Sequence, residues 1–507
     1  MTPAASLSSA SSAFGALLVL AVIVPLCGLV PMLLCAPRRV EQVALLLLGL
    51  GGLIVGAIAV RVAATGAALD DVIGGWAPPL GMALRADGLS VVMLVMTAVV
   101  VVATGLFART DRAAPTSAMP PAFWMLLMGL WSALNLVFVA QDLFSLYVAL
   151  ELLTFAAVPL VCLDGSRKTL DAALRYLLFA LFGSVLYLLA TALLYGAYGT
   201  LDLPQLAQHV RASGTPEPAL VLALALMSVG MAAKAALFPL HLWLPPAHAG
   251  APAAASALLS ALVIKAPIYL LVRIWCDLAG PPLAAAGAPL LAIMGAGAVW
   301  LCGVMALRQG RLKLLIAYST AAQIGYLFLM FPLAGIAGAA PWETIAWTGG
   351  ALQLVSHAFS KAAMFMAAGL IAEALGHDRI ADFGGLGRIL PVSVFAFGLG
   401  GLSLMGLPPS GGFVAKVMLL TAAVQQERWW IAGVILAGGL LAGGYVLRVV
   451  VPALFRTGGA VAVAQVSPRR QGVALGLALV AVVLGFVPLQ PIGFLAIGRA
   501  ALIGSAP

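Results

Sequence analysis

Four lysines lie inside apolar stretches of the sequence, where a charged side chain is costly. Each stretch runs for about 20 residues, the length that crosses a bilayer, and the lysines are Lys234, Lys265, Lys361 and Lys416. A charged side chain at the centre of a membrane costs about 2.5 to 3.5 kcal/mol on insertion scales. Of the 17 acidic residues, only Glu151 lies deep in such a stretch. One carboxylate cannot pair with four ammonium groups, so these lysines need another purpose.

Proton transfer is the chemistry that these groups can do. A lysine held away from water favours its neutral form, which makes it able to accept and release a proton near neutral pH. The charge of Glu151 would stabilise the protonated form of a lysine beside it. Separating such a pair would then release the proton, so the pair would act as a switch. The alternative is that the charges form structural ion pairs that lock helices together.

Histidines extend the set of groups that can carry a proton. His357 and Lys361 are four residues apart, so they share one face of a helix, and a proton could pass between them directly or through one water. His241 and His248 flank the end of an interrupted apolar stretch and are candidates for an auxiliary relay. For each of these histidines a purely structural role is an equal alternative.

The composition places these groups in a membrane protein. Of the 507 residues, 63% are hydrophobic and 8% are charged, which is too little polar surface to cover a soluble globule. The apolar runs do not alternate with a period of two as barrel strands do, so we predict an all-α polytopic membrane protein with about fourteen transmembrane helices. The predicted spans are 13–35, 43–63, 87–107, 121–140, 142–163, 172–197, 218–246, 253–275, 284–306, 314–332, 345–374, 390–424, 430–454 and 472–496.

The basic residues predict how the spans are oriented. The connections after odd-numbered spans carry sixteen of the 26 basic residues, and those on the other side carry six, among them Arg85 and Arg273. Connections rich in lysine and arginine face the cytoplasm. We therefore expect a multi-pass protein of the bacterial inner membrane with both termini on the outer, periplasmic side. The first span has no basic residue before it and no small-residue cleavage site after it, so we expect it to remain in place.

Two predicted spans contain helix-breaking residues next to a lysine. In KAALFPLHLWLPPAHAG, Pro239 follows Lys234 by five residues. In GLPPSGGFVAK, Pro408 and Pro409 precede Lys416. Both spans are too long for one straight crossing, and a break frees backbone groups that lipid tolerates only where protein or water satisfies them. Such breaks mark candidate ion sites.

The breaks occupy corresponding places if the spans form two units of five. Spans four to eight and nine to thirteen each carry the break in their fourth helix. Because five is odd, the two units would enter the membrane in opposite orientation, as inverted repeats. We therefore expect N-terminal helices at 1–120, a first repeat at 121–280, a second at 281–455 and a C-terminal helix at 456–507.

Five stretches, in this order and at suitable spacing, resemble one known family. The family comprises the antiporter-like subunits shared by respiratory complex I, Mrp-type sodium/proton antiporters and membrane-bound hydrogenases, and the resemblance covers roughly 80–425. The stretches are KAALFPLHLWLPPAHAGAP (234–252), ALLSALVIKAPIYLLVRI with Lys265, LKLLIAYSTAAQIGY (312–326), HAFSKAAMFMAAG (357–369) and GLPPSGGFVAK (406–416).

This resemblance implies a role for each group. Glu151 and Lys234 would be the coupling ion pair, and Lys265 the central relay. His357 and Lys361 would belong to the path through the second half, where Lys416 would be the terminal lysine. A lysine at 416 is more similar to the complex I N and L subunits or the Mrp D subunit than to the M subunit. The partners implied are other membrane subunits of a multisubunit complex, the bilayer and the transported ion, with no nucleic acid.

We therefore expect a proton-translocating membrane subunit of a complex related to NADH:quinone oxidoreductase or hydrogenase. The five cysteines have no metal-binding spacing and no dinucleotide-binding glycine motif is present, so we expect no cofactor and no metal, and any electron transfer belongs to partners. One alternative is a sodium/proton antiporter subunit of the Mrp D type. Another is a structural membrane anchor that conducts no ion, and an enzyme in its own right is the weakest option.

Overall fold

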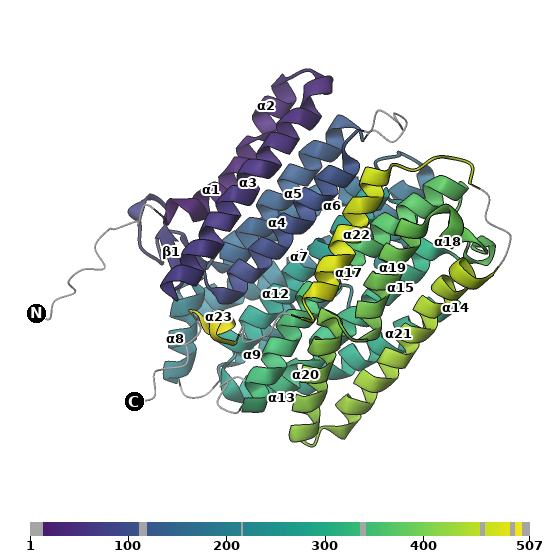
Figure 1. The fold of residues 1–507 in the computed structure, drawn as a ribbon. Helices are drawn as coiled ribbons and strands as arrows, with labels where there is room; N and C mark the ends of the chain where they lie inside the picture. Colours follow the sequence, from purple (N-terminus) through teal and green to yellow (C-terminus); the bar gives the residue numbers. More distant parts are fainter. Residues whose placement is uncertain are drawn as a thin grey trace, which may run out of the picture.

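The computed structural model describes residues 14–110, 119–213, 216–334, 341–456, 462–486 and 492–498. They form a bundle of long helices, shown in Figure 1, and the prediction of an all-α polytopic membrane protein is confirmed. Eleven of the predicted spans coincide with a helix long and apolar enough to cross a membrane. These are α1–α2 (Ala16–Cys27 and Leu29–Leu34), α3 (Pro37–Thr65), α4 (Gly88–Ala108), α5 (Pro121–Val139), α6 (Leu143–Val161), α7 (Arg167–Tyr198), α11–η3–α12–η4 (Ala253–Leu258, Leu259–Val263, Lys265–Arg273 and Ile274–Leu278), α13–η5–α14 (Gly280–Gly297, Ala298–Cys302 and Gly303–Arg308), α15–α16 (Leu312–Leu329 and Phe331–Ala334), α17 (Pro341–Leu375) and α21 (Trp429–Phe455).

The other three predicted spans are shorter or interrupted. The seventh is α9 followed by a break and α10, and the twelfth is α19 followed by a break and α20. The fourteenth is α22, which ends earlier than predicted, and residues 487–491 of that predicted span lie outside the described residues. The bounds are Pro218–Lys234 for α9, Leu244–Gly250 for α10, Pro391–Met405 for α19, Gly411–Gln425 for α20 and Pro468–Val483 for α22.

Several short elements were not predicted from the sequence. A two-stranded antiparallel hairpin joins α3 to α4, and the longest polar connection contains an amphipathic helix, α8. Figure 1 shows β1, α8 and α23 at one end of the bundle, with α2 and α18 at the other. The bounds are Leu69–Val72 for β1, Ile73–Gly75 for η1, Ala83–Ala86 for β2, Leu203–Ser213 for α8, Ile380–Asp382 for η6, Leu386–Ile389 for α18 and Ile492–Ala496 for α23.

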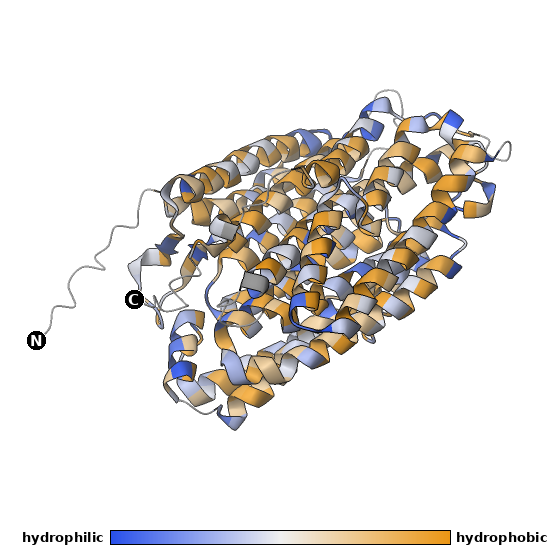
Figure 2. Cartoon of the chain, turned by 60° about the horizontal axis from the view of Figure 1, so that its bottom comes forward, coloured by the Kyte–Doolittle hydropathy of each residue, from blue (hydrophilic) through white to orange (hydrophobic). Residues whose placement is uncertain are grey.

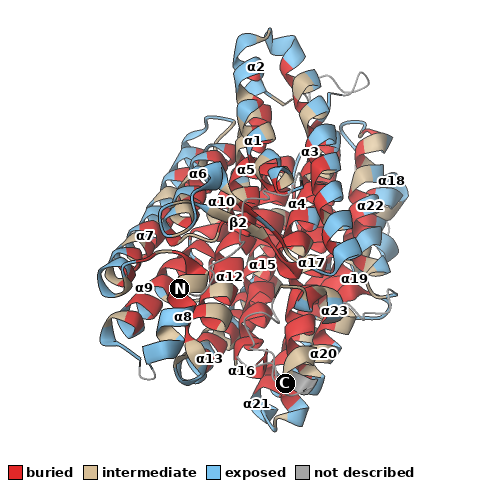
Figure 3. Cartoon of the chain, turned by 90° about the vertical axis from the view of Figure 1, so that its left-hand side faces the viewer, coloured by how far each residue is buried: buried red, intermediate tan, exposed pale blue. Residues whose placement is uncertain are grey.

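Three spans form the interior of the bundle. The most apolar window of α11–α12 is 100% buried and those of α15 and α17 are 89% buried, against 33% for α3 and α21. Figure 3 shows this gradient from the buried centre to the exposed outer helices. Figure 2 shows that the outer faces are largely hydrophobic, with hydrophilic residues at the helix ends. An apolar exterior suits contact with lipid tails, so the chain is a membrane protein.

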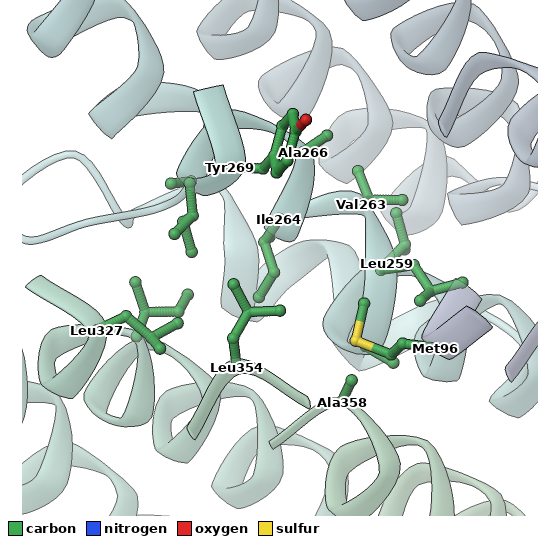
Figure 4. Packing of buried hydrophobic residues seen from close by; sticks show 14 of the residues in the cluster. Met96, Leu259, Val263, Ile264, Ala266, Tyr269, Leu327, Leu354 and Ala358 are labelled. Atoms are coloured by element: carbon green, nitrogen blue, oxygen red, sulfur yellow. The ribbon is translucent and has the colours of Figure 1, made fainter. Parts of the chain in front are cut away.

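Apolar packing holds the central helix in place. Figure 4 shows Leu259 and Val263 of η3 beside Met96 of α4, with Leu327 of α15 and Leu354 of α17 on the opposite side. All five side chains are at most 6% exposed. The η3 and η4 segments are π-helical, and a π-turn inserts one residue into an α-helix and commonly lies at a functional site. The first of these turns ends at Val263, two residues before Lys265.

Two glycines bring α7 and α9 into backbone contact. A Cβ atom placed on Gly183 would lie 2.5 Å from the Gly230 carbonyl oxygen and 3.0 Å from Cγ of Lys234, and a Cβ on Gly230 would lie 2.6 Å from the Gly183 carbonyl. Small residues permit such close packing of membrane helices. The pair therefore fixes the distance at which Lys234 meets α7.

We expect Gly183→Ala to destabilise the protein, because the new methyl group meets backbone that cannot move alone. Overpacking of this kind typically costs about 1–3 kcal/mol. Thermal unfolding of the purified protein in detergent measures the effect. The matched control is Gly196→Ala on the same helix, where a Cβ meets nothing within 4 Å. Equal unfolding midpoints for the two variants would contradict the role of the glycine contact.

Candidate functional site: a row of buried lysines

The structure brings Glu151 and Lys234 together. Nζ of Lys234, the last residue of α9, lies 3.4 Å from Oε1 of Glu151 on α6, and the side chains are 6% and 15% exposed. The lysine also donates to the Thr154 hydroxyl at 3.2 Å, and Ser184 of α7 donates to the same carboxylate oxygen. Among the described residues, this is the one ion pair that includes any of the four lysines singled out from the sequence.

The predicted helix break follows directly after this pair. The chain leaves α9 at Lys234 and resumes as α10 at Leu244, with Pro239 between them. Ending a helix frees backbone carbonyls, and here Nε1 of Trp243 donates to the carbonyl of Ala233 at 2.9 Å. An indole from the far side of the break therefore closes the end of α9, which allows an interrupted helix inside an apolar protein.

Both auxiliary histidines lie near this break and are buried. Nδ1 of His241, in the break itself, has no hydrogen-bond partner among the described residues. His248 of α10 is fully buried, and neither of its ring nitrogens has a partner in the described part of the chain. Its ring stacks on Phe365 of α17 with the centroids 4.6 Å apart. Buried polar atoms without protein partners are sites where a water or a transferred proton is expected.

Lys265 and His357 form the centre of the site. Nζ of Lys265 lies 2.7 Å from Nδ1 of His357 and donates to the Ser260 carbonyl at 2.7 Å. The lysine is fully buried and the histidine is 1% exposed. The contact joins α12 to α17 across 92 residues of sequence. His357 thus contacts Lys265, and among the described hydrogen bonds the direct contact to Lys361 that the helical spacing allows is not made.

Lys361 instead contacts α15. Its ammonium group donates to the Ile316 carbonyl at 3.1 Å and to the Ser319 hydroxyl. The neighbouring hydroxyl of Thr320 lies 2.9 Å from the hydroxyl of Ser260, the residue whose carbonyl accepts from Lys265. Hydroxyl groups of α15 therefore connect the surroundings of Lys265 and Lys361.

Lys416 lies at the second helix break. Its ammonium group donates to the Leu404 carbonyl at 2.6 Å and stands 4.3 Å above the ring of Tyr326. The break between α19 and α20 contains Pro408 and Pro409, as predicted, and ends where the Ser410 hydroxyl accepts from the backbone of Phe413, the first turn of α20. A ring face beneath a desolvated cation contributes about 2 kcal/mol. The break thus supplies a carbonyl oxygen to a buried lysine.

An amide and hydroxyl network extends from Lys416 toward the centre. Gln323 of α15 donates to the same Leu404 carbonyl at 3.2 Å and lies 3.2 Å from the hydroxyl of Tyr445. Gln353 of α17 donates to Gln323 at 3.1 Å. Sequence reasoning missed Gln323 and Tyr445, together with Ser260, Ser319 and Thr320. For Ser319, Thr320 and Gln323 the available signal was the run of polar residues in LKLLIAYSTAAQIGY, an otherwise apolar span.

Arg273 does not lie in a connection between spans, where the count of basic residues on each side of the membrane had placed it. It lies in α12 with its side chain 11% exposed, because Asp87 at 2.6 Å and Asp277 at 3.2 Å both pair with its guanidinium group. Burial would raise the pKa of Asp87, but the guanidinium and the Ser90 backbone lower it, and the net pKa is below its ordinary value. A paired arginine can be buried inside a helix, so it does not mark a membrane surface.

The described residues include no group of three or more histidine, cysteine or acidic side chains that could hold a metal ion. The five cysteines are free thiols. The site consists of ionisable side chains, hydroxyl groups and amides. The arrangement can therefore hold and transfer protons.

Fold and site together define a polytopic membrane protein with an internal row of lysines. Residues 140–442 match the family described as NADH:quinone oxidoreductase/Mrp antiporter, transmembrane. The chain belongs to this family, which confirms the resemblance seen in the sequence.

The chain is similar to proteins from more than one kind of complex, as two relatives and one solved structure show. The chain is 33% identical to the N subunit of NADH-quinone oxidoreductase from Desulforudis audaxviator over 384 residues, 75% of this chain and 74% of the relative. It is 30% identical to the D subunit of the Na(+)/H(+) antiporter from Alkalihalophilus pseudofirmus over 372 residues, 73% and 72% of the two chains. A chain of the Mrp complex from Dietzia sp. DQ12-45-1b has the same fold, with a TM-score of 0.84, 23% identity and coverage of 97% and 98%.

We expect Ser319→Ala to lower stability, because it removes a hydrogen-bond partner of the Lys361 ammonium group. A hydrogen bond contributes about 0.5–1.5 kcal/mol, and about 1.5–3 kcal/mol when one partner is charged. The matched control is Ser360→Ala, since the Ser360 hydroxyl is buried and has no partner among the described residues. Thermal unfolding in detergent should show a lower midpoint for the first variant alone. An equal or greater loss in the control would contradict the described contact.

Proposed function

We propose that this chain moves protons across the membrane as an antiporter-like subunit of a multisubunit complex. The contact between Lys265 and His357 carries the proposal. Two proton-accepting nitrogens lie 2.7 Å apart in the most buried part of the bundle, with no carboxylate within ion-pair distance among the described residues. A structural ion pair would need an anion here, whereas a proton relay needs two acceptors in contact.

The pair of Glu151 and Lys234 is the proposed switch. While the two groups are in contact, the carboxylate stabilises the protonated lysine. When they separate, the buried ammonium group loses its counter-charge, and the free energy of its protonated form rises. Lys234 then gives up its proton toward the interior. Thr154 and Ser184 hold the two partners in the paired state.

The central relay follows from the hydrogen bonds at His357. A protonated Lys265 passes a proton to Nδ1 of His357, and the imidazolium that forms releases a proton from Nε2, the nitrogen with no partner among the described residues. Lys361 lies four residues after His357 on α17, and Lys416 lies on α20, which packs against α17. The second half of the pathway then runs over these two lysines, held by the Ile316 and Leu404 carbonyls.

Sodium/proton exchange is the second candidate function. The observation that favours it is the likeness to the sodium/proton antiporter of A. pseudofirmus. Sodium requires a shell of several oxygen ligands. At Glu151, the deep carboxylate, Oε1 already accepts from Lys234 and Ser184. Protons therefore fit the site better than a metal cation does. A structural anchor that conducts no ion is the third candidate.

The organisation of the chain is part of the proposal. We infer two inverted repeats, 121–280 and 281–455, because the breaks after α9 and α19 fall in the fourth span of each. The lysines stand on opposite sides of the two breaks, Lys234 before the first and Lys416 after the second. The parent complex would place the chain in a bacterial inner membrane beside other membrane subunits, with both termini outside.

We expect Glu151→Gln and Lys234→Ala to abolish most proton uptake by vesicles that carry the purified parent complex. The first variant removes the charge that stabilises the lysine, and the second removes the proton carrier. Uptake is measured at matched assembly with sodium varied. Lys168→Ala is the matched control, because this lysine is exposed at the start of α7. It should leave uptake unchanged.

The outcomes separate the three candidates. Loss of uptake in both variants without a sodium requirement supports proton relay. Transport that depends on sodium favours the antiporter. Normal uptake in both variants at full assembly would show that the charges are structural and would refute the proposed mechanism.

We also expect His357→Gln to slow proton uptake at least about tenfold, within the range that a positioned acid–base group contributes. Glutamine can still accept from Lys265 through its amide oxygen, but it cannot carry a proton onward. The control is His209→Gln at the exposed face of α8. Rates measured in the same vesicles would contradict the relay if the two variants transported equally well.

A further inference from the structure

A cavity with several charged and amide side chains in its wall lies at the end of the bundle where β2, α8 and α12 meet. Its volume is about 200 Å³, and it lies away from the row of lysines described above. Charged and amide side chains contribute to its wall, including Arg85, Gln141, Gln208 and Asp277. A cavity needs about 10–15 Å³ of such space to hold one water, so this one has room for several. The charged and amide groups in its wall can hydrogen-bond to them.

A buried hydrogen-bonded cluster forms the inner wall of this cavity. Nη2 of Arg273 donates to Asp87 at 2.6 Å and to the Ser90 hydroxyl at 3.1 Å, and Nε donates to the Tyr269 hydroxyl at 3.0 Å. The Tyr269 hydroxyl donates in turn to the Phe138 carbonyl at 3.0 Å. The cluster thus joins α12 to α4 and α5, and its polar groups continue from the cavity into the bundle.

The cluster lies on the same helical face as the central lysine. Lys265, Tyr269 and Arg273 follow one another at intervals of four along α12. Side chains at this spacing stack along one face. Eight residues at 1.5 Å each place Arg273 roughly 12 Å from Lys265 along the helix axis. The cavity therefore stands at the end of the helix that carries the relay.

We propose that this cavity is the aqueous mouth of the pathway at Lys265, with Tyr269, Arg273 and Asp87 as its inner wall. The inference rests on the proposed proton transport and adds the place where the pathway meets water. The cavity wall carries two positive side chains, Arg85 and Arg273, and two negative ones, Asp87 and Asp277, so its charges balance. Tyr269 is the hydroxyl that lies between the cavity and the interior.

A structural clamp between α4 and α12 is the alternative role for these contacts. Mutating Arg273 or Asp87 would not distinguish the two, because leaving one buried charge unpaired is strongly destabilising in either case. The wall of the cavity offers a better test. Gln208 is exposed at the rim on α8, and Gln141 lies in the connection between α5 and α6. Neither side chain belongs to the cluster of charged groups.

The experiment introduces Gln208→Cys and Gln141→Cys separately into the full complex. A cationic, membrane-impermeant methanethiosulfonate is applied to both sides of the vesicles, and proton uptake is measured before and after labelling. A positive group in the mouth should slow uptake about tenfold, or about 1.4 kcal/mol in barrier height. The control is Thr65→Cys, an exposed position at the same end of the bundle that does not line the cavity. The labelled parent protein controls for the native cysteines.

Slower uptake in the two cavity variants, with normal uptake in the control and the labelled parent, supports the mouth. Unchanged uptake after complete labelling of both cavity positions overturns it. Equal slowing of the Thr65→Cys control overturns it as well, because the effect would then belong to charge anywhere at this end. These failures differ from failure of the proposed function, in which the unlabelled complex takes up no protons.

Discussion

Burial of more positive groups than negative ones is the constraint on which this structure depends. Four lysines enter the interior with one deep carboxylate, yet each ammonium nitrogen has an acceptor. Three of them are held by backbone carbonyls, of Ser260, Ile316 and Leu404. A carbonyl can accept from either a charged or a neutral amine, because both forms have N–H groups to donate. The interior therefore satisfies the lysines without fixing their charge, as a proton pathway requires.

Irregular helices supply part of these acceptors. In a regular α-helix each carbonyl accepts from the amide four residues on, so a side chain must share a carbonyl that already has a partner. Ser260 lies in the π-helical turn η3, and Leu404 lies at the end of α19, where carbonyls have no helical partner. The surrounding apolar packing holds this irregular backbone in place, and so keeps the two carbonyls directed at the lysines. The broken and widened helices are thus part of the site.

The sequence was sufficient for the spans, the two breaks and the ionisable residues, because each depends on local hydropathy or on proline and glycine. It was insufficient to predict which side chains these ionisable residues contact. The contact of Lys265 with His357 joins residues 92 positions apart and depends on how α12 packs against α17. Arg273 was assigned to a loop because counting basic residues ignores a carboxylate such as Asp87 that arrives from another helix. The α8 helix and the hairpin were missed because a hydropathy window detects only long apolar runs.

The position of the carboxylate explains how such a pathway can be controlled. Glu151 is the more exposed member of its pair, on a helix whose most apolar window is 50% buried, whereas Lys265 lies in a window that is 100% buried. A neighbouring subunit that contacts α6 can therefore change the surroundings of Glu151 without disturbing the central packing. The close contact of Gly183 with Gly230 keeps Lys234 against α7 while this happens. In the proposed mechanism, the charge of Lys234 then changes while the packing around Lys265 stays fixed. The movable part of the proposed switch and the fixed part of the proposed relay thus lie on different helices.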